Sequence, residues 1–560
     1  MNECPWLQCY DAEVPHSLEY PNEDIQALVA KAAERHPERP ALIFMGKTIT
    51  YRQLMDLTAR FAGGLKDLGL AKGDRVVLLM PNCPQFVISF LALQRLGVTA
   101  VLANPLNVER ELIFKFHDSG AKGLIALDLL SQRVNKIRKE VTLDFIVYTS
   151  LADFLPFPLN LLYPVKRGLD KSMPKVVIER DASTHFFKGL LKKGRPVPAA
   201  AGSPEDLAVL IYSGGTTGVS KGIMLSQRAI VANAWQACSW VDMGLADSLL
   251  AVLPLFHGFG MSVCMNAPLS HGGTVILLPR FQAKEVVDAI VRHKPSLFAG
   301  VPTMFIAIKE LPDIDSYDLK SLRGIFVGAA PLPLAVMREF ESRTGAALIE
   351  GYGLTEAVTA VACNPFRGKR KPGTIGIPFP DVRWRVVDLA EGKRDMPPGE
   401  AGEIIIKCPE LMSGYLNQPE KTDECLRDGW LYTGDIGVMD EEGYITLVDR
   451  KKDLVIVSGF NVFPSEVDEV LHDHPKVAEA VAVGLPHPKK GEYLKAYVVP
   501  KAGQSIEPNE IIDFCKENLS AYMVPKEVEV RSELPKSMIG KVLRRSLREE
   551  EEKKWESAGR

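Results

Sequence analysis

The sequence predicts an α/β fold, in which a large N-terminal domain of layered αβ subdomains precedes a small C-terminal α+β domain. Helical and strand patterns alternate over residues 23–150 and again over 207–350. An apolar run at 207–211, which predicts a buried strand, leads into a loop rich in glycine and hydroxyl groups. A charged run, Asp449-Arg-Lys-Lys-Asp453, then sets the last hundred or so residues apart as a smaller unit.

The first segment, residues 23–150, is predicted to be scaffold. Apolar residues at helical spacing predict helices at 24–35, 51–68 and 83–96, whereas 74–79 and 99–103 read as strands. A hairpin is expected over 42–51, turning at Gly46-Lys47. No side chains in this segment suggest chemistry.

Residues 154–193 interleave apolar and basic side chains. An apolar stretch broken by prolines, 154–164, is followed by Lys166, Arg167, Lys171 and Lys175, and 186–193 reads Phe-Phe-Lys-Gly-Leu-Leu-Lys-Lys. Such a mixture can dock on an anionic membrane surface, which predicts peripheral membrane contact. Because prolines interrupt helices, we expect no continuous amphipathic helix here. The favoured interpretation is an insertion packed on the protein's own surface, with its lysines in water.

The loop at 212–222, Tyr-Ser-Gly-Gly-Thr-Thr-Gly-Val-Ser-Lys-Gly, has the composition of an anion cradle. Glycines allow backbone N–H groups to point at an anion, hydroxyls add donors, and Lys221 adds a positive charge. The spacing differs from both the Walker A motif and the dinucleotide fingerprint. We therefore predict a polyphosphate site, with a flexible surface loop as the alternative.

Alternating strands and helices follow this loop as far as residue 350. Strands are expected at 222–225, 249–254, 274–278, 297–301, 325–328 and 347–350, and helices at 226–240, 283–293, 303–310 and 334–343. Ligands of such sheets bind beyond the carboxyl ends of the strands. The residues predicted there are Ser213 onward, His257, Pro302, Gly328-Ala329-Ala330 and Gly351 to Glu356. These segments should converge.

The C-terminal residues predict a small α+β unit. A strand at 445–448 precedes the charged run, helices are expected at 464–472 and 507–519, and strands at 477–484 and 494–499. Gly540-Lys541 follows a loop near the end, where an isolated lysine would by default be a surface residue.

Composition excludes several classes of protein. Lys+Arg number 67 against 70 Asp+Glu, a net charge of −3, so no basic excess favours nucleic acid. The nine cysteines are scattered and form no CxxC pair, which favours a reducing cytoplasm. The first residues lack the pattern of a signal peptide, and no apolar run is long enough to span a bilayer.

The loop at 212–222 resembles the phosphate-binding motif of the adenylate-forming superfamily, which comprises acyl- and aryl-CoA synthetases, luciferases and adenylation domains. Its Ser-Gly-Gly-Thr-Thr-Gly form is most similar to fatty-acyl-CoA synthetases, and the resemblance spans nearly the whole chain. It implies a large domain, 1–450, that binds AMP and the acyl group, and a small mobile domain, 451–560. The charged run would be the hinge between them, with Lys452 as its pivot.

The resemblance also implies the roles of individual residues in binding ATP, Mg²⁺ and CoA. The nucleotide, its phosphates and CoA would contact Ser213, Gly214, Gly215, Thr216, Thr217, Gly218, Lys221, Gly328, Ala329, Ala330, Gly351, Tyr352, Gly353, Thr355, Asp435, Arg450, Ser458, Gly459 and Phe460. Thr216, Thr355 and Glu356 would supply oxygen ligands for Mg²⁺. Tyr352 would stack on adenine, and Asp435 would accept the ribose hydroxyls.

Three residues are assigned to catalysis by the same resemblance. They are Lys541, which would stabilise the charge that builds up when a carboxylate attacks the α-phosphate, His257 and Glu356. His257 would orient the carboxylate or gate the acyl tunnel. Many long-chain members carry a tryptophan gate four residues after this histidine, where this chain has Met261.

The predicted function is an ATP-dependent acyl-CoA synthetase for medium- to long-chain fatty acids, acting through an acyl-adenylate. It would be a cytoplasmic monomer or homodimer, peripheral at the inner membrane surface through 154–193. Alternatives are a ligase for aryl or cyclic carboxylates and an adenylating enzyme that loads a carrier protein. A non-catalytic binding protein is disfavoured, because Thr355, Glu356, Asp435 and Lys541 are all present.

Overall fold

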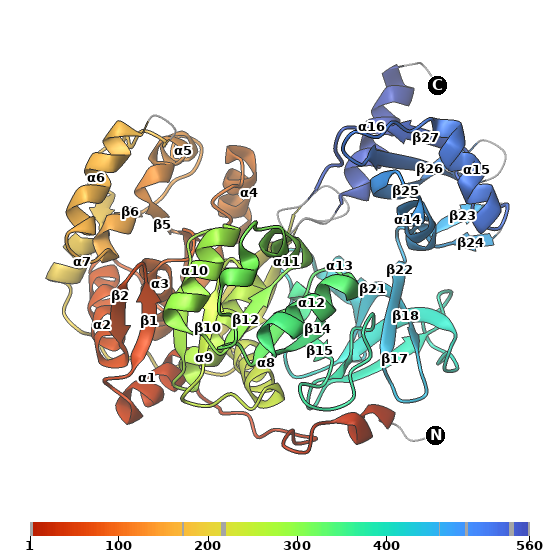
Figure 1. Cartoon of the computed structure of the whole chain (residues 1–560). Helices are drawn as coiled ribbons and strands as arrows, with labels where there is room; N and C mark the ends of the chain where they lie inside the picture. Colours follow the sequence, from red (N-terminus) through yellow and green to blue (C-terminus); the bar gives the residue numbers. More distant parts are fainter. Residues whose placement is uncertain are drawn as a thin grey trace. The chain divides into compact units, whose positions relative to one another are not determined.

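The computed structural model describes residues 4–170, 173–213, 220–457, 460–487, 491–536 and 542–557 (Figure 1). The chain forms two compact units. The larger consists of Trp6–Arg383 and Lys407–Gly429, and the smaller chiefly of Trp384–Ile406 and Trp430–Arg560. Residues 384–406 and 430–450 thus group with the C-terminal residues, and a domain boundary at 450 stays a prediction.

One sheet of the larger unit leads to the predicted phosphate loop. Its eight strands have the order β19-β9-β8-β4-β3-β5-β6-β7. They are β3 (Arg75–Leu79), β4 (Thr99–Leu102), β5 (Gly123–Leu127), β6 (Phe145–Thr149), β7 (Thr184–Phe186), β8 (Leu207–Ser213), β9 (Lys221–Ser226) and β19 (Gly414–Tyr415). Strands β4, β3, β5, β6 and β7 run parallel to β8, whereas β9 is antiparallel to β8. Helices α3 (Pro84–Leu96), α4 (Glu109–Ser119), α5 (Ser131–Ile137) and α7 (Phe187–Lys193) connect these strands.

The second sheet of the larger unit has nine strands in the order β16-β15-β14-β13-β12-β10-β11-β1-β2. They are β1 (Pro40–Phe44), β2 (Lys47–Thr50), β10 (Ser248–Ala251), β11 (Thr274–Leu277), β12 (Leu297–Gly300), β13 (Gly324–Val327), β14 (Ala347–Gly353), β15 (Ala360–Cys363) and β16 (Ile377–Pro378). Helices α10 (Ala283–His293), α11 (Pro302–Lys309) and α12 (Leu334–Thr344) lie in front of this sheet (Figure 1). Their apolar faces, including Val286, Phe305 and Phe340, pack on Leu250, Phe298 and Ile325 of the strands.

The predicted helices and strands of this unit are confirmed, with ends that differ by a few residues. Local capping chemistry explains several helix starts. Asp24 accepts the N–H of Ala27 and begins α1 (Ile25–Arg35), and Thr50 forms a capping box with Gln53 at the start of α2 (Tyr51–Asp67). Ser226 caps α8 (Gln227–Trp240). Short helices α9 (Ala267–Ser270) and α13 (Pro419–Cys425), and strand β20 (Leu426–Arg427), complete the unit.

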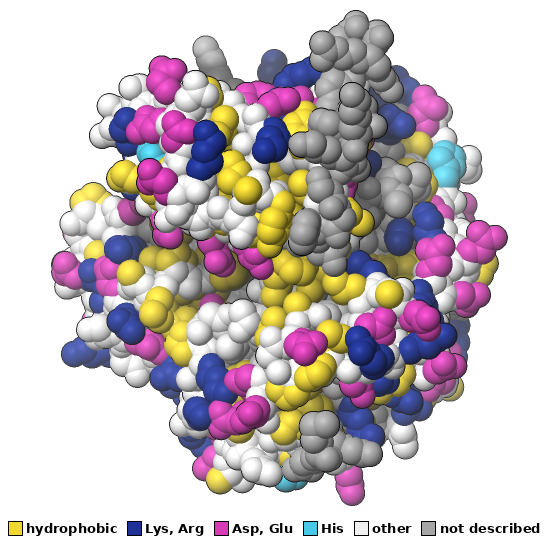
Figure 2. Space-filling model, turned by 90° about the vertical axis from the view of Figure 1, so that its right-hand side faces the viewer, with side chains coloured by type: hydrophobic (Ala, Val, Ile, Leu, Met, Phe, Trp, Pro, Cys, Tyr) yellow, Lys and Arg dark blue, Asp and Glu magenta, His cyan; other side chains and the backbone are white. Residues whose placement is uncertain are grey.

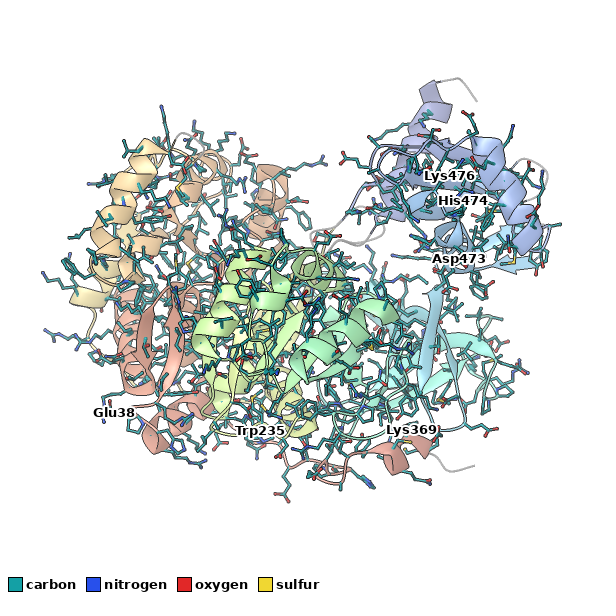
Figure 3. The ribbon with its side chains drawn as sticks, viewed as in Figure 1. Glu38, Trp235, Lys369, Asp473, His474 and Lys476 are labelled. Carbon is teal, nitrogen blue, oxygen red and sulfur yellow. The ribbon has the colours of Figure 1, made fainter. Side chains whose placement is uncertain are left out.

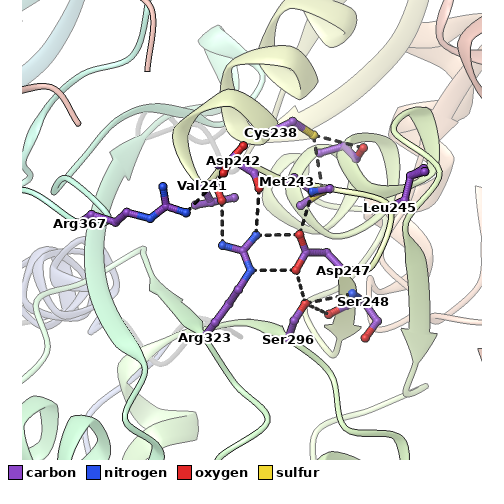
Figure 4. A network of polar contacts seen from close by, with 12 residues as sticks. Cys238, Val241, Asp242, Met243, Leu245, Asp247, Ser248, Ser296, Arg323 and Arg367 are labelled. Carbon is purple, nitrogen blue, oxygen red and sulfur yellow. Dashed lines mark hydrogen bonds and ion pairs between the residues drawn. The ribbon is translucent and has the colours of Figure 1, made fainter. Parts of the chain in front are cut away.

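A half-buried ion pair ties the amino ends of the central strands to the turn after α8 (Figure 4). Arg323, just before β13, donates from Nε and Nη2 to the two carboxylate oxygens of Asp247 at 2.8 and 2.7 Å. Ser296 donates to the same carboxylate at 2.6 Å, and Arg323 also donates to the carbonyl of Val241. Bidentate geometry makes this a strong pair, which holds β10, β12 and β13 in register at the edge opposite their carboxyl ends.

The smaller unit contains two sheets. The first belongs to a five-stranded sheet and includes β17 (Arg383–Val387), β18 (Ala401–Lys407), β21 (Trp430–Met439) and β22 (Ile445–Arg450). The second comprises β23 (Val455–Val457), β24 (Phe460–Val462), β25 (Val477–His487), β26 (Gly491–Pro500) and β27 (Glu527–Val530), with α14 (Pro464–Asp473), α15 (Pro508–Asn518) and α16 (Arg544–Ser557). The α+β pattern predicted for the C-terminal residues is confirmed.

Polar contacts join two helices of this unit. His474 and Lys476, which follow Asp473 at the end of α14 (Figure 3), approach Glu510 of α15 at 3.6 and 2.8 Å. The ring of His474 also meets Phe514 edge-on, with centroids 4.9 Å apart. These contacts hold α14 against α15.

One sequence prediction for residues 154–193 is wrong. A continuous helix, α6 (Leu159–Leu169), runs through Pro164, where we expected the prolines to prevent one. A proline removes one backbone hydrogen bond and crowds the preceding turn, but a short surface helix tolerates this when other contacts hold it.

Charged side chains of both signs are interspersed over the face drawn in Figure 2, in keeping with the small net charge. No helix in the described ranges has the length and apolar character needed to cross a membrane.

Candidate nucleotide site

The predicted phosphate loop is a hairpin connection between β8 and β9. Ser213 and Lys221 are register partners at its base, and the hydroxyl of Ser220 donates to the carbonyl of Ser213 at 2.8 Å. The two ends of the loop are therefore held together directly beyond the carboxyl end of β8. Gly214, Gly215, Thr216, Thr217 and Gly218, which carry the predicted contacts to phosphate, lie outside the described residues.

Lys221, Tyr415 and Glu356 form a chain of contacts next to this loop. The Nζ atom of Lys221 lies 4.4 Å from the ring centroid of Tyr415, a cation–π contact. The hydroxyl of Tyr415 donates to Oε1 of Glu356 at 2.9 Å. Burial and the carboxylate of Glu356 raise the pKa of Tyr415, so the phenol stays protonated and donates. The predicted phosphate lysine and the predicted magnesium ligand thus share one tyrosine.

Strand pairing brings Tyr415 to this position. The short strand β19 pairs with β9, with Tyr415 opposite Ile223, and Leu416 donates its N–H to the carbonyl of Gly222. Met412 in turn donates its N–H to the carbonyl of Glu356 at 2.7 Å. Residues 412–416 therefore connect the phosphate hairpin to the Glu356 turn.

The Gly351–Glu356 motif starts on a strand and ends on a turn. Gly351, Tyr352 and Gly353 belong to β14, which continues three residues beyond the predicted end, and Thr355 and Glu356 lie in a 3₁₀ turn (Thr355–Ala357). A Cβ atom on Gly353 would come within 1.6 Å of the carbonyl oxygen of Thr359, so only glycine fits there. Tyr352 is buried, whereas Thr355 and Glu356 are half-buried and accessible to a ligand.

Close glycine contacts bring three predicted motifs together. A Cβ on Gly258, the residue after His257, would lie 2.0 Å from the carbonyl oxygen of Val358. A Cβ on Gly328 would lie 2.9 Å from the ring of Phe259. The segments at 257–260, 328–330 and 351–356 therefore meet at the carboxyl ends of the strands, as the sequence predicts.

Ala329 and Ala330 are exposed after β13, and Ala329 adopts a positive φ of 72°. This left-handed conformation is rare for a residue with a side chain and often occurs at functional sites. It turns the chain sharply at the strand end.

His257 has a defined tautomer. The N–H of Phe259 donates to Nδ1 of His257 at 3.2 Å, so Nδ1 is the unprotonated nitrogen and Nε2 carries the hydrogen. The surrounding protein lowers the pKa of His257 by desolvation, although its side chain stays accessible to solvent. The imidazole is therefore neutral at pH 7 and can donate from Nε2.

Met261 follows at the start of a π-helical segment, Gly260–Asn266. The wider turns of π-helices occur frequently at functional sites. Met261 itself is fully buried at this position.

The smaller unit carries the other predicted nucleotide residues. Asp435 on β21 and Arg450 on β22 are register partners, and Arg450 Nε lies 2.9 Å from Asp435 Oδ1. Asp435 is buried, and its backbone N–H donates to the hydroxyl of Thr433 at 3.0 Å. The pairing presents a carboxylate and a guanidinium together, a combination suited to a ribose and a phosphate.

The predicted hinge begins directly after Arg450. Lys451 pairs with Glu403 at 2.8 Å, whereas the side chain of Lys452 is exposed. Before the hinge, the buried carboxylate of Asp449 accepts the N–H and the hydroxyl of Ser465 at 2.8 and 2.9 Å. The start of α14 is thus tethered to the end of β22.

Arg544 contacts the same region. Its guanidinium pairs with Asp468 at 2.5 Å, approaches Asp449 at 3.8 Å, and donates to the carbonyl of Ala482. Lys541, three residues earlier, lies outside the described residues, as do Ser458 and Gly459, and only the backbone of Phe460, in β24, is described.

Sequence reasoning missed Tyr415 and Arg544. Gly414-Tyr415 carries no local pattern that separates it from a core strand, and Arg544 reads as one charge in a basic run. Only the spacing of Arg544 from Lys541 could have suggested a role for it.

Comparison with known proteins identifies relatives over the whole chain. A family model described as AMP-binding enzyme matches residues 29–416, and a second, AMP-binding enzyme C-terminal domain, matches residues 466–541. A long-chain-fatty-acid–CoA ligase of Bacillus subtilis (strain 168) is 41% identical over 555 residues, 98% of each chain. A feruloyl-CoA synthase of Amycolatopsis sp is 32% identical over 533 residues, 94% of this chain and 99% of the relative. The crystal structure of ATP-bound MatB from Rhodopseudomonas palustris superposes with a TM-score of 0.81 at 28% identity, covering 94% of this chain and 99% of MatB.

Proposed function

This chain belongs to the AMP-binding enzyme family, and from that membership we propose that it is an ATP-dependent long-chain fatty acid–CoA ligase. The observation that carries the proposal is the 41% identity, over 98% of both chains, to a long-chain-fatty-acid–CoA ligase. The contacts among Lys221, Tyr415 and Glu356 support it, because they place a cation and a carboxylate beside the phosphate hairpin.

The reaction has two steps. First, a carboxylate oxygen of the fatty acid attacks the α-phosphorus of ATP, the bond to the β-phosphate breaks, and acyl-AMP and pyrophosphate form. Then the thiolate of CoA attacks the acyl carbon, the bond to AMP breaks, and the thioester and AMP are released. A cation near the phosphates lowers the barrier of the first step by stabilising the negative charge of the transition state.

Residues of the larger unit would bind the phosphates and orient the acid. Ser213, Lys221 and the hairpin loop would hold the triphosphate, with Gly328 to Ala330 and Gly351 to Thr355 around adenine and the acyl carboxylate. His257 would donate from Nε2 to the acid, because its Nδ1 already accepts the N–H of Phe259.

The residues present fit a magnesium ion. Mg²⁺ usually binds through one or two carboxylates together with substrate phosphates. Glu356 is a half-buried carboxylate whose Oε1 is oriented by Tyr415, so it would hold the ion beside the phosphates, with Thr216 as a second oxygen ligand. When bound, the ion would neutralise phosphate charge.

Residues of the smaller unit would complete the two steps. Asp435 would accept the ribose hydroxyls and Arg450 would contact the nucleotide. Lys541 would support adenylation, and rotation about Lys452 would then withdraw it and bring Ser458, Gly459 and Phe460 to the pantetheine arm of CoA. Conducting two chemistries in one site requires such motion.

An aromatic carboxylate is a second candidate substrate. The 32% identity to a feruloyl-CoA synthase favours it, and Met261 stands where many long-chain members carry tryptophan. Chain-length preference follows pocket depth, because each buried methylene contributes about 0.8 kcal/mol.

Location and assembly belong to the same proposal. We expect a cytoplasmic monomer or homodimer that contacts the inner membrane surface peripherally through residues 154–193.

The test supplies the full chain with ATP, Mg²⁺, CoA and a series of acids: saturated C8 to C18 acids and a hydroxycinnamic acid. Pyrophosphate release and CoA thioester are measured in the same reactions. We expect both products in equal amounts, with the highest kcat/KM for a long-chain acid. Preference for the aromatic acid would establish the second candidate. Pyrophosphate without thioester would indicate a different acceptor and overturn the ligase proposal.

A further inference from the structure

The base of the phosphate hairpin is built around the ring of Tyr212. This residue precedes Ser213 at the end of β8 and pairs in register with Gly222 of β9, which follows Lys221. A Cβ atom on Gly222 would come within 3.1 Å of the Tyr212 ring, so the ring packs directly on the backbone of β9. Tyr212 is buried. The position of its ring therefore constrains both strands of the hairpin next to Lys221.

Asp118 of α4 holds the polar end of this ring. The hydroxyl of Tyr212 donates to Oδ2 of Asp118 at 2.7 Å. Burial and the carboxylate of Asp118 raise the pKa of Tyr212, so the phenol stays protonated and donates. The side-chain amide of Asn417, two residues after β19, donates to Oδ1 and to the carbonyl of Asp118 at 3.2 and 3.0 Å. Asp118 thus holds the ends of β8 and β19 together.

Lys115, three residues before Asp118 on α4, is a buried lysine that contacts the same ring. Its side chain donates from Nζ to Oδ1 of Asn107 at 2.7 Å, and Nζ lies 5.6 Å from the ring centroid of Tyr212, a cation–π contact. The residue is only 6% exposed, and within the described part of the chain no carboxylate forms an ion pair with it. Since a buried charge is costly without partners, the ammonium depends on the amide and on the ring of Tyr212.

The charge of Lys115 changes between pH 7 and pH 9.5. Burial lowers the pKa of Lys115 to about 8, and the carboxylate of Glu111 opposes this effect only in part. Arg133 and Lys136 donate instead to the carbonyl of Pro105 and to the carboxylate of Glu109. The charged and titratable groups on α4 and on the elements that pack around Lys115 are Glu109, Arg110, Glu111, His117 and Asp118 of α4, Arg133 and Lys136 of α5, Tyr212 of β8 and Lys221 of β9.

We propose that Lys115 and Asp118 are positioning residues for ATP, which clamp Tyr212 from α4 and thereby hold Lys221 in place at the base of the phosphate hairpin. Asp118 fixes the hydroxyl of Tyr212, and the ammonium of Lys115 attracts its ring. Loss of that charge loosens the ring against the backbone of Gly222, the neighbour of Lys221. The inference rests on the proposed binding of phosphates by this hairpin, but not on which acid or acceptor the enzyme uses.

The test measures the Kd of ATP and of AMP, each with Mg²⁺, for the full chain by isothermal titration calorimetry at pH 7 and pH 9.5, without acid or CoA. Lys115→Met keeps the apolar stem and removes the charge, whereas Tyr212→Phe keeps the ring and removes only the bond to Asp118. The matched control is Lys136→Met, which removes an exposed lysine that pairs with Glu109 of the same helix at 3.0 Å. AMP serves as the control ligand because it lacks the β- and γ-phosphates.

At pH 7 we expect Lys115→Met to weaken ATP binding about tenfold or more, because cation–π contacts are strong when desolvated, and to change AMP binding little. At pH 9.5 the wild type and Lys115→Met should bind ATP equally, since Lys115 is then uncharged. Tyr212→Phe should weaken ATP binding severalfold at both pH values, and Lys136→Met at neither.

Equal Kd values for ATP in the wild type and Lys115→Met at pH 7, or the same deficit at both pH values, would overturn the role of the Lys115 charge. A parallel loss of AMP binding would also overturn it, because the substitution would then damage the whole site. An unchanged Kd in Tyr212→Phe would remove Asp118 from the proposal. A wild type that binds ATP but forms no thioester with any acid would contradict the ligase proposal alone.

Discussion

Tyr415 donates a hydrogen bond from its hydroxyl to Oε1 of Glu356, with the two oxygens 2.9 Å apart. Fifty-nine residues separate the two; β19 pairs with β9, and Met412 just before β19 donates its N–H to the carbonyl of Glu356. Lys221 lies over the same tyrosine ring, so one side chain contacts both a predicted phosphate ligand and a predicted magnesium ligand.

Tyr415→Phe should therefore impair adenylation. The substitution removes a hydrogen bond to a carboxylate, typically worth about 1.5–3 kcal/mol, while keeping the ring under Lys221. We expect kcat/KM for ATP to fall about tenfold or more and the Mg²⁺ concentration for half-maximal rate to rise, measured by ATP–pyrophosphate exchange. Tyr317→Phe, which also removes a tyrosine–carboxylate hydrogen bond (to Asp313, 3.1 Å), is the control and should leave both unchanged. Equal effects of the two variants would refute a specific role for Tyr415.

Arg450 and Asp435 should act on ATP as a unit. Because they contact each other at 2.9 Å, Arg450→Ala and Asp435→Asn should each raise the KM for ATP about tenfold, and the double variant should do little more than the worse single variant. Arg385→Ala, which breaks the exposed pair with Asp395 in the same unit, is the control. Strictly additive losses in the double variant would show that the two residues contribute independently.

Arg544 is expected to position Lys541. Arg544 lies three residues after Lys541, and Arg544→Ala removes its contacts to Asp468 and Ala482. Loss of these contacts should displace Lys541, and a small displacement of a catalytic group can slow a reaction about 100-fold. We expect a 10- to 100-fold slower adenylation step but near-normal thioester formation from preformed acyl-AMP and CoA. Arg545→Ala, which breaks an exposed pair with Glu549, is the neighbouring control. Equal losses in both half-reactions would indicate general destabilisation instead.

Glu410 should make stability depend on pH. It is fully buried, and burial raises the pKa of its carboxyl to about 8, against about 4.3 in an unfolded chain. Between these two pH values the folded protein therefore binds one proton more than the unfolded chain. The contribution of Glu410 to the free energy of unfolding is greatest below pH 4.3, and it falls by about 1.4 kcal/mol per pH unit as the pH rises to 8. The Tm of the wild type should fall relative to that of Glu410→Gln between pH 6 and 8. A constant difference in Tm over this range would show that Glu410 does not titrate there.

The fold was largely predictable from the sequence. Helix α10 coincides with its predicted range, and α1 and α8 begin where Asp24 and Ser226 cap them. Apolar periodicity and capping act between residues a few positions apart, so they can be read from a short stretch. The exception is α6, where Pro164 suggested a break and a tertiary ion pair holds the helix instead.

The sequence by itself determined the α/β architecture, the family and the segments that meet at the strand ends, because their motifs consist of neighbouring residues. Only the tertiary structure decided that Tyr415 orients Glu356, that Arg450 pairs with Asp435, and that α6 turns its leucines outward. Each of these depends on which strands pair and in what register, or on a charge far along the chain. Such relationships arise when the whole chain packs, and no local pattern encodes them.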